Sequence, residues 1–506
     1  MALFFTPVTA VVHATLKAFA VICSACLFFV AVQTVYNLWL HPLRKIPGPL
    51  LARVSRLWAR IGNFYGRKSE RIHAAHERYG PVVRVGPNEV SFSSPDAVHE
   101  IYMSASFGKE ETFYRAKRMF HENHLFSFRD PEAHRQRRKM LSRGFSQAAM
   151  LDFEASLSTK IQTLLSQWAS RTADGSPIDI YPWCHWLGFD TVYHLMFDED
   201  PGSLNAGRPH EVMQYIRAWR PTFIWKEFFP QLETWGPSVP GPLGNMFRLV
   251  RTWKMLATNI IRNCRLKDTK TPFLRGALTE VDPYLGRPLT DSELAEECMG
   301  GMFGGSGTTA NTFLFLVWAV ARDAQIKSKL RLELIEAFPD PLAVPDYTTC
   351  AKLPYLSAVI NETLRRYPTI VATLPRTAKE EVVVQGVRIP KNTIVGTQNY
   401  TIHRDYEAFP QPEVFRPERW LDDDNDMQQL RKKAFTPFGV GSRKCVGINL
   451  AQLELWKVVA AFFRRFDCSI DPSISEADMR MYDTFSATPA GGKLLVRLTD
   501  LSHPNK

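Results

Sequence analysis

One cysteine lies in a glycine-rich loop that could hold a flat, metal-containing cofactor. The loop runs from Phe438 to Gly447 with the sequence FGVGSRKCVG, and an apolar helical pattern follows it. Cys445 therefore falls just before a predicted helix N-terminus, where the helix dipole favours a thiolate over a thiol. Glycines let the backbone approach a cofactor closely, and the guanidinium of Arg443 suits a cofactor carboxylate. The alternative is a buried structural cysteine in a glycine-rich turn.

A second segment carries five glycines inside a predicted helix. They lie in the sequence GGMFGGSGTT, which spans residues 300–309, and each costs roughly 0.5 to 1 kcal/mol relative to alanine in a helix interior. The predicted helix begins at the capping box of Thr290 and Glu293 and continues to about Arg322. Two explanations are open: close helix packing through small residues, or a backbone that opens beside a ligand.

These motifs resemble those of the cytochrome P-450 superfamily. The cysteine loop matches the family pattern F-x-x-G-x-R-x-C-x-G at every fixed position, and the resemblance covers essentially the whole chain. It implies haem b (iron protoporphyrin IX) as the cofactor, Cys445 as the axial ligand of the haem iron, and a monooxygenase that uses dioxygen. A thiolate ligand helps to cleave the O–O bond because it pushes electron density toward the opposite face of the haem.

The resemblance assigns the glycine-rich helix to the oxygen side of the haem. The positions that match the family are Gly304, Gly305, Thr308 and Thr309. Gly307 stands where the family has an acid. We therefore expect Thr308 to be the catalytic residue that helps to deliver protons, with water at Gly307 linking it to solvent or to a substrate hydroxyl. The departure at Gly307 keeps an alternative open, a haem-thiolate isomerase or dehydratase that acts without a reductase.

The resemblance also implies two sets of charged residues around the haem. The predicted donors to the haem propionates are His134, Arg138, Arg376 and Arg443. The predicted charge triad, buried and structural in role, consists of Glu362, Arg365 and Arg419. His134 stands where the family commonly has a tryptophan. The E-x-x-R spelling of the triad is weak alone, because Glu132 and Arg135 have the same spacing.

The N-terminal region predicts a membrane anchor. The stretch from Ala18 to Leu40 carries no charge and, at about 1.5 Å per residue, is long enough to cross a hydrocarbon core of ~30 Å. A cleaved signal peptide is the alternative, but its apolar region would be shorter. Arg44 and Lys45 follow directly and favour the cytosolic side. We expect a single pass through the endoplasmic reticulum membrane with a cytosolic catalytic domain.

The expected fold class is mainly α with small β-sheets (α+β), a cytochrome P-450 fold preceded by a single N-terminal transmembrane helix. Residues 1–17 would be a short lumenal N-terminus, 18–40 the transmembrane helix, 41–50 a proline-rich hinge, and 51–506 one haem-thiolate catalytic domain. Val82–Phe92 alternates as strand, turn and strand, Glu381–Val395 indicates a second small sheet, and most segments between residues 130 and 370 are helical.

The net charge of +11 and the pI near 9.2 are compatible with a membrane surface or an acidic partner. The chain has no nucleic-acid-binding motif, so we expect no nucleic acid, and no G-x-G-x-x-G fingerprint, so electrons from NADPH would come through a flavoprotein reductase. The basic residues expected to be exposed for its docking are Arg135, Arg137, Lys139, Arg431, Lys432, Lys433 and Lys444.

Family position suggests four segments that line a substrate pocket: Phe113–Phe128, Trp219–Phe229, Thr369–Leu374 and Thr484–Ser486. Most of their side chains are apolar or aromatic, which predicts a hydrophobic small-molecule substrate that partitions from membrane lipid. Ordinary core packing is the alternative for each one. The hinge and the sequence FRPERW are similar to those of filamentous-fungal members, many of which modify polyketides, terpenoids or alkaloids.

Overall fold

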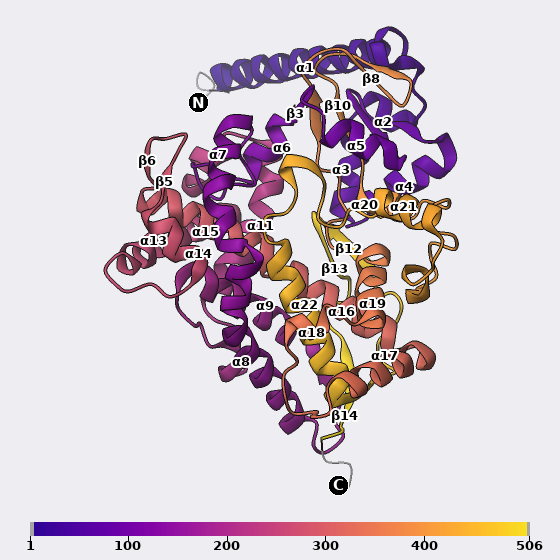
Figure 1. Cartoon of the computed structure of the whole chain (residues 1–506). Helices are drawn as coiled ribbons and strands as arrows, with labels where there is room; N and C mark the ends of the chain where they lie inside the picture. Colours follow the sequence, from indigo (N-terminus) through magenta and orange to yellow (C-terminus); the bar gives the residue numbers. More distant parts are fainter. Residues whose placement is uncertain (1–4, 503–506) are drawn as a thin grey trace.

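The protein's structure is a computed structural model that describes residues 5–502. Long helices form most of the body, and the small sheets lie around them (Figure 1). The longer helices of the body are α7 (Pro131–Leu141), α8 (Gln147–Arg171), α9 (Ile180–Phe197), α11 (Val212–Phe228), α13 (Gly241–Cys264), α15 (Asp291–Gly305), α16 (Thr308–Ala321), α17 (Ala324–Ala337), α19 (Pro354–Arg366) and α22 (Ile448–Arg465). The predicted mainly helical class is confirmed.

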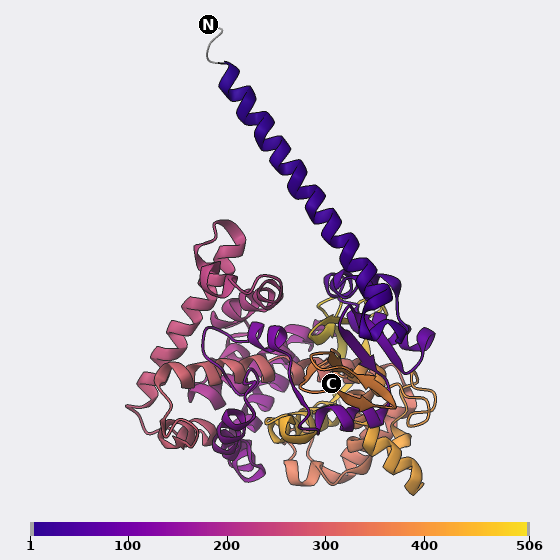
Figure 2. The same ribbon diagram turned by 90° about the horizontal axis from the view of Figure 1, so that it is seen from above.

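The N-terminal helix α1 (Phe5–Val35) projects away from the body (Figure 2). A π-helical turn, Tyr36–Leu40, continues it. The segment His13–Leu40 contains an 18-residue window with a mean hydropathy of 2.3 and is long and apolar enough to cross a membrane, consistent with a membrane anchor. The helix runs without a break through residue 17, so the expected boundary between a lumenal segment and the spanning helix is not a structural boundary.

A buried arginine helps to attach the π-helical turn after α1 to the body. The Arg84 guanidinium is fully buried and donates to the Asn37 backbone oxygen at 2.8 Å and to the Pro87 oxygen at 2.6 Å. Arg84 lies on strand β1 (Val82–Gly86), which pairs antiparallel with β2 (Glu89–Phe92). The predicted strand, turn and strand are therefore confirmed.

The main sheet has the strand order β1-β2-β10-β7-β3, where the remaining strands are β10 (Ile394–Gly396), β7 (Arg376–Ala378) and β3 (Phe107–Lys109). The second small sheet expected over 381–395 is only partly right. The hairpin of β8 (Val382–Val384) and β9 (Val387–Ile389) forms a sheet of its own, but β10 pairs in parallel with β2. Pairing between strands so distant in sequence leaves no local signal.

Other strands join distant parts of the chain. A three-stranded sheet has the order β11-β14-β4, from β11 (Phe466–Ile470), β14 (Leu495–Asp500) and β4 (Ile178–Asp179). The hairpin of β12 (Met481–Thr484) and β13 (Ser486–Pro489) has Phe485 at its tip. Shorter helices that bear on the site are α5 (Pro95–Tyr102), α6 (Glu111–Ala116) and α21 (Asn425–Ala434).

The glycine-rich helix is two helices rather than the single one expected. Its N-terminal capping box is present, since Glu293 N–H donates to the Thr290 hydroxyl at 3.2 Å and Thr290 N–H to the Glu293 carboxylate at 2.9 Å. α15 ends at Gly305 and α16 begins at Thr308. The break has a local cause: glycines stabilise a helix weakly, and a threonine hydroxyl can compete for a backbone carbonyl.

Candidate functional site

Two glycines with positive φ shape the cysteine loop. Gly439 has a φ of +72° and Gly441 a φ of +69°, a region that side chains disfavour. A Cβ on Gly441 would also lie 3.0 Å from the Tyr102 carbonyl oxygen. The loop then turns back, so that Cys445 N–H donates to the Phe438 oxygen at 2.9 Å, and α22 begins at Ile448 as predicted.

The Cys445 side chain is accessible to solvent, although protein surrounds it on several sides. This partial enclosure raises the pKa of its thiol, whereas a hydrogen bond from the Gly447 backbone and the charges of Arg138 and Lys444 lower it. Arg138 Nη1 also donates to the Lys444 carbonyl oxygen at 2.6 Å. A cation beside the sulfur and a backbone donor to it are the features that favour a thiolate ligand.

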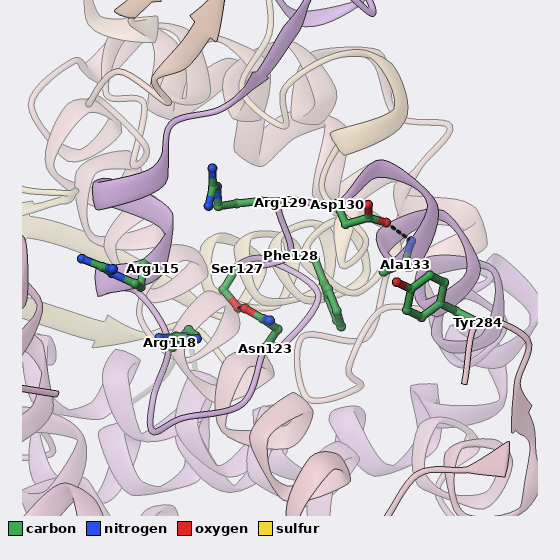
Figure 3. A pocket seen from close by; sticks show the side chains of 9 residues that line it. All are labelled: Arg115, Arg118, Asn123, Ser127, Phe128, Arg129, Asp130, Ala133 and Tyr284. Atoms are coloured by element: carbon green, nitrogen blue, oxygen red, sulfur yellow. Dashed lines mark hydrogen bonds between the residues drawn. The ribbon is translucent and has the colours of Figure 1, made fainter. Parts of the chain in front are cut away.

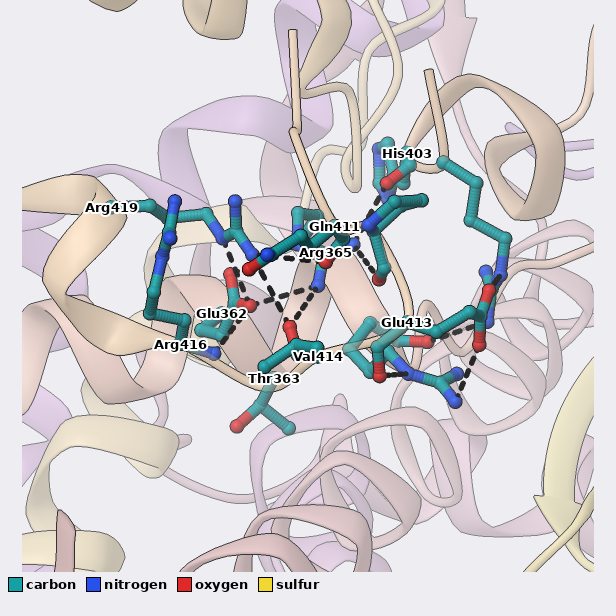
Figure 4. Close-up of polar contacts among 12 residues, drawn as sticks. Glu362, Thr363, Arg365, His403, Gln411, Glu413, Val414, Arg416 and Arg419 are labelled. Carbon is teal, nitrogen blue, oxygen red and sulfur yellow. Dashed lines mark hydrogen bonds and ion pairs between the residues drawn. The ribbon is translucent and has the colours of Figure 1, made fainter. Parts of the chain in front are cut away.

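The three residues of the predicted charge triad meet in one buried cluster (Figure 4). Both Glu362 oxygens accept from Arg365, at 2.8 and 2.9 Å, and Arg419 Nε donates to Glu362 at 3.1 Å. All three side chains are 0% exposed. Arg365 also donates to the carbonyl oxygens of His403 and Pro412, at 3.0 and 2.8 Å.

His403 connects this cluster to the cysteine loop. Its ring nitrogen Nε2 accepts from the Thr436 backbone N–H at 3.0 Å, two residues before the loop begins at Phe438. Burial and the neighbouring Arg365 lower the pKa of His403 to about 3, so its ring is neutral and can accept. His403 therefore links the triad to the backbone that leads into the cysteine loop. That the triad stabilises the loop through this link remains a prediction.

The predicted propionate donors lie near one another with one residue that the sequence analysis missed. Lys109 on β3 stands opposite Arg376 on β7 in the register of the two strands. Lys109 is buried, and its Nζ donates to the Phe126 oxygen at 2.5 Å. Within the described residues, Lys109, Arg138, Arg376 and Arg443 have no ion pair with a carboxylate. Nothing local in the sequence pairs these strands.

Burial and mutual repulsion mark this basic cluster as an anion site. They lower the pKa of Lys109 well below its ordinary value, and they lower that of Arg443 to about 10. His134 has its pKa lowered by burial and by Arg443, so it is a neutral donor rather than a cation. Buried cations without partners are costly. A cofactor with two carboxylates would complete the cluster.

The five glycines of the broken helix divide into two groups. A Cβ on Gly300, Gly301 or Gly305 would lie only 2.6 to 2.7 Å from a side chain, respectively those of His124, Met196 and Val192. Close packing, the first explanation, therefore accounts for these three. A Cβ on Gly304 would meet nothing within 4 Å, and one on Gly307 would meet only an atom at 3.9 Å. These two glycines leave space, as expected if the backbone opens beside a ligand. Thr308 Oγ1 donates to the Gly304 oxygen at 2.9 Å.

An aromatic cluster joins three of the four segments predicted to line the substrate pocket, all except Thr369–Leu374. Phe303 of α15 is its centre: ring centroids lie 5.1 Å away for Phe223, 5.6 Å for Phe485 and 6.5 Å for Phe126. Phe113 lies 5.9 Å from Phe485. Phe485 has a φ of +90°, a strained conformation for a bulky residue, and strain of this kind is concentrated at functional sites.

Two buried glutamates hold the loop that carries Phe126. Glu296 accepts from the backbone N–H groups of Met119 and Phe120 at 2.7 and 3.0 Å. Glu297 accepts from Leu125 N–H at 2.8 Å and from Arg137 at 2.6 Å. The loop is therefore fixed against α15.

Two of the basic residues expected on the surface are buried. Arg137 is 3% exposed because it bridges Glu297 and Asp282. Arg431 is 4% exposed and donates to the Arg419 carbonyl oxygen. The expectation that these two face solvent is wrong. The exposed members of the set are Arg135, Lys139, Lys432 and Lys444.

A surface pocket lies on the outer side of the same loop (Figure 3). Its lining residues are Arg115, Arg118, Asn123, Ser127, Phe128, Arg129, Asp130, Ala133 and Tyr284. Five of them, Arg115, Arg118, Asn123, Ser127 and Phe128, belong to the segment Phe113–Phe128 that was predicted to line the substrate pocket. Arg443 of the cysteine loop donates to the Phe128 oxygen at 3.1 Å, so the pocket adjoins that loop.

Fold and motifs together define a haem-thiolate class of protein, and comparison with known proteins agrees. Residues 53–496 match the family model "Cytochrome P450", and the chain belongs to the cytochrome P450 family. It is a cytochrome P450 monooxygenase, which confirms the class that the resemblance implied, and membership of this family implies a haem-thiolate cofactor.

The similar proteins include several from fungi. A tryprostatin B 6-hydroxylase of Aspergillus fumigatus is 32% identical over 442 residues, 86% of this chain and 76% of that protein. The cytochrome P450 monooxygenase tazI of Aspergillus terreus is 29% identical over 485 residues, 93% and 96% of the two chains. The crystal structure of the cytochrome P450 CYP102L1 superposes with a TM-score of 0.72 at 21% identity, covering 86% and 94%, which shows the fold.

Proposed function

We propose that this cytochrome P450 binds haem b through Cys445 and oxidises a hydrophobic small molecule of fungal secondary metabolism. The observation that carries the proposal is the basic cluster beside the cysteine loop, in which Lys109 and Arg376 are buried and the arginines nearest the loop are partly buried. Arg443 belongs to the loop itself, and Arg138 is hydrogen-bonded to it through the Lys444 oxygen at 2.6 Å. A thiol donor next to partly buried cations without carboxylate partners fits a metal-bearing dicarboxylate such as haem.

Each side chain of the cluster has a role in this proposal. Arg138, Arg376 and Arg443 donate to the two propionates, with the neutral ring of His134 as a further donor and Lys109 as a fifth. Arg376 is oriented by Tyr114, whose hydroxyl lies 2.6 Å from Nη1. Haem, when bound, supplies the iron that activates dioxygen. The protein supplies the anion site and a sulfur ligand with a backbone donor.

On the opposite side, we propose that Gly304 and Gly307 leave room beside Thr308, whose hydroxyl holds the proton that the reaction requires. The aromatic cluster around Phe303 packs against an apolar substrate and keeps water away from it. An aromatic cage suits a flat or ring-containing molecule. The related tryprostatin B 6-hydroxylase makes hydroxylation the first reaction to test.

We also propose how the chain lies in the membrane and which partner supplies its electrons. Residues 18–40 anchor the chain in the endoplasmic reticulum membrane, residues 1–17 face the lumen, and residues 51–506 form one cytosolic catalytic domain after the hinge at 41–50. An NADPH-dependent flavoprotein reductase in the same membrane supplies electrons. The exposed basic residues Lys432 and Lys444, near the cysteine loop, attract its acidic surface.

Co-expression with a fungal reductase, followed by mass spectrometry of the metabolites, tests the reaction. A product that gains one oxygen atom, with NADPH consumed and the second oxygen atom released as water, supports the proposal. Loss of two hydrogens with NADPH consumed also supports it, as a further oxidation. A product of unchanged mass that forms without NADPH contradicts it and favours an isomerase.

A further inference from the structure

Behind the break between α15 and α16, an imidazole from a third helix faces the position where the acid is missing. A Cβ built on Gly307 has His185 Cε1 of α9 as its nearest neighbour, at 3.9 Å. This atom lies between the two ring nitrogens, so both nitrogens are close to the same space. The neighbouring glycines differ: Gly301 and Gly305 are filled to 2.7 Å by Met196 and Val192.

A buried carboxyl group lies on the same side of the break. Glu454 of α22 is 2% exposed, and burial raises its pKa to about 8, although a hydrogen bond with the Thr309 side chain lowers it. Its Oε1 is 3.7 Å from a Cβ built on Gly188, and that Cβ would lie only 2.8 Å from the Ser306 oxygen. Gly188 follows His185 by three residues, on the same face of α9.

The outer side of His185 is aromatic and partly exposed. The ring centroids of Tyr181 and His185 lie 4.5 Å apart, and both residues are only partly buried. A neutral imidazole can donate a proton from one ring nitrogen and accept one at the other, so it can pass protons from one side of the ring to the other. His185 thus lies between a partly exposed face of α9 and the break beside Thr308.

We propose that His185 is the positioning residue that supplies protons to Thr308, in place of the acid missing at Gly307; this inference rests on the proposed function. A proton leaves the imidazolium and passes through water at Gly307 to Thr308 Oγ1 as that hydroxyl gives up its own proton. Solvent then returns a proton to the ring. Glu454, whose carboxyl group is kept neutral by burial, adds no negative charge to the break.

The first test measures the product formed per NADPH consumed in the full-length protein with its reductase. His185→Phe keeps a ring against Tyr181 but removes both nitrogens, so we expect product per NADPH to fall on the order of tenfold. Haem content and the Soret spectrum should stay as in the wild type. His194→Phe is the matched control, because His194 is on the same helix but is hydrogen-bonded to Ser156 at 2.9 Å.

A second variant restores an acid at the vacant position. Gly307→Asp in the His185→Phe background should recover the coupling of NADPH to product, because Gly307 has space for a side chain. A merely structural role of His185 would not be rescued in this way. Wild-type coupling in His185→Phe would overturn the proposal.

The readout that does not depend on turnover is the titration of His185, followed by NMR of histidine labelled at Cε1. A carboxylate within about 4 to 6 Å raises a histidine pKa by about 1 unit or more. Gly307→Asp should therefore raise the pKa of His185 and leave that of His194 unchanged; an unchanged His185 would contradict the geometry. If the wild type consumes no NADPH, the proposed function fails, while this titration still tests the placement of His185.

Discussion

At the scale of single residues, Thr308 is the side chain that we propose to hold the proton required by the reaction. Its hydroxyl donates to the Gly304 oxygen at 2.9 Å, beside the two glycines that leave space. Thr308→Ala should uncouple the reaction, so that product per NADPH falls on the order of tenfold while haem content stays unchanged. The matched control is Thr312→Ala, one turn further along α16, which should keep the wild-type ratio.

Replacing Lys109 with methionine should stabilise the haem-free protein but weaken the binding of haem. Burial and the nearby Arg443 disfavour its charge, so Lys109→Met should raise the melting temperature of the haem-free protein. The same change removes a propionate donor and should speed the loss of haem to an acceptor protein. Lys379→Met, at an exposed lysine just after β7, is the control. A Lys109→Met variant that stabilises both the haem-free and the haem-bound protein, or destabilises both, would be inconsistent with the assigned role.

Two arginines show why the burial and the partners of a single residue could not be predicted from the sequence. Arg135 and Arg137 lie in one basic stretch of α7, yet Arg135 pairs with Glu132 at the surface and Arg137 is buried between two carboxylates. One partner, Asp282, is far along the chain and lies opposite only after α7 and strand β5 (Val281–Asp282) pack together. Motif spacing located the cysteine loop because that loop is local; these partners are not.

At the scale of elements, we expect the triad to hold the cysteine loop in its shape. Glu362→Gln leaves Arg365 and Arg419 buried without a counter-charge, at a cost of about 3 to 5 kcal/mol. We expect a lower melting temperature and loss of haem, with no change in selectivity of the protein that remains. Glu132→Gln, in the same E-x-x-R spelling but at an exposed pair, should leave the melting temperature unchanged. Equal effects of the two would refute the triad's role.

The elements themselves were predicted unevenly. The strands over Val82–Phe92 and the start of α22 follow from local alternation and from the glycines before the helix, and both are present. The break at Ser306 and Gly307 was not located, although a backbone that opens beside a ligand was one of the two explanations for the glycines. Only the three-dimensional surroundings show which glycines pack and which leave space. The positions of β3 and β7 side by side depend on pairing across the whole chain.

At the scale of the whole molecule, the attachment of α1 to the body predicts where the anchor can be cut. Deletion of residues 1–34 should release the protein from membranes and keep its stability, since Asn37 remains. Deletion of residues 1–40 removes the Asn37 oxygen that accepts from buried Arg84, at a cost of about 1 to 3 kcal/mol. Sedimentation and melting temperatures of the two truncations measure this difference, and equal melting temperatures would show that the contact contributes nothing.

The central claim is that Cys445 is the thiolate ligand of a haem, and the spectrum of the reduced carbon monoxide complex tests it most directly. The wild type should show the strongly red-shifted Soret band of a thiolate-ligated haem, and so should Cys26→Ser, a cysteine on α1 far from the loop. Cys445→Ser should lose that band. A Cys445→Ser protein that keeps the red-shifted band would contradict the account.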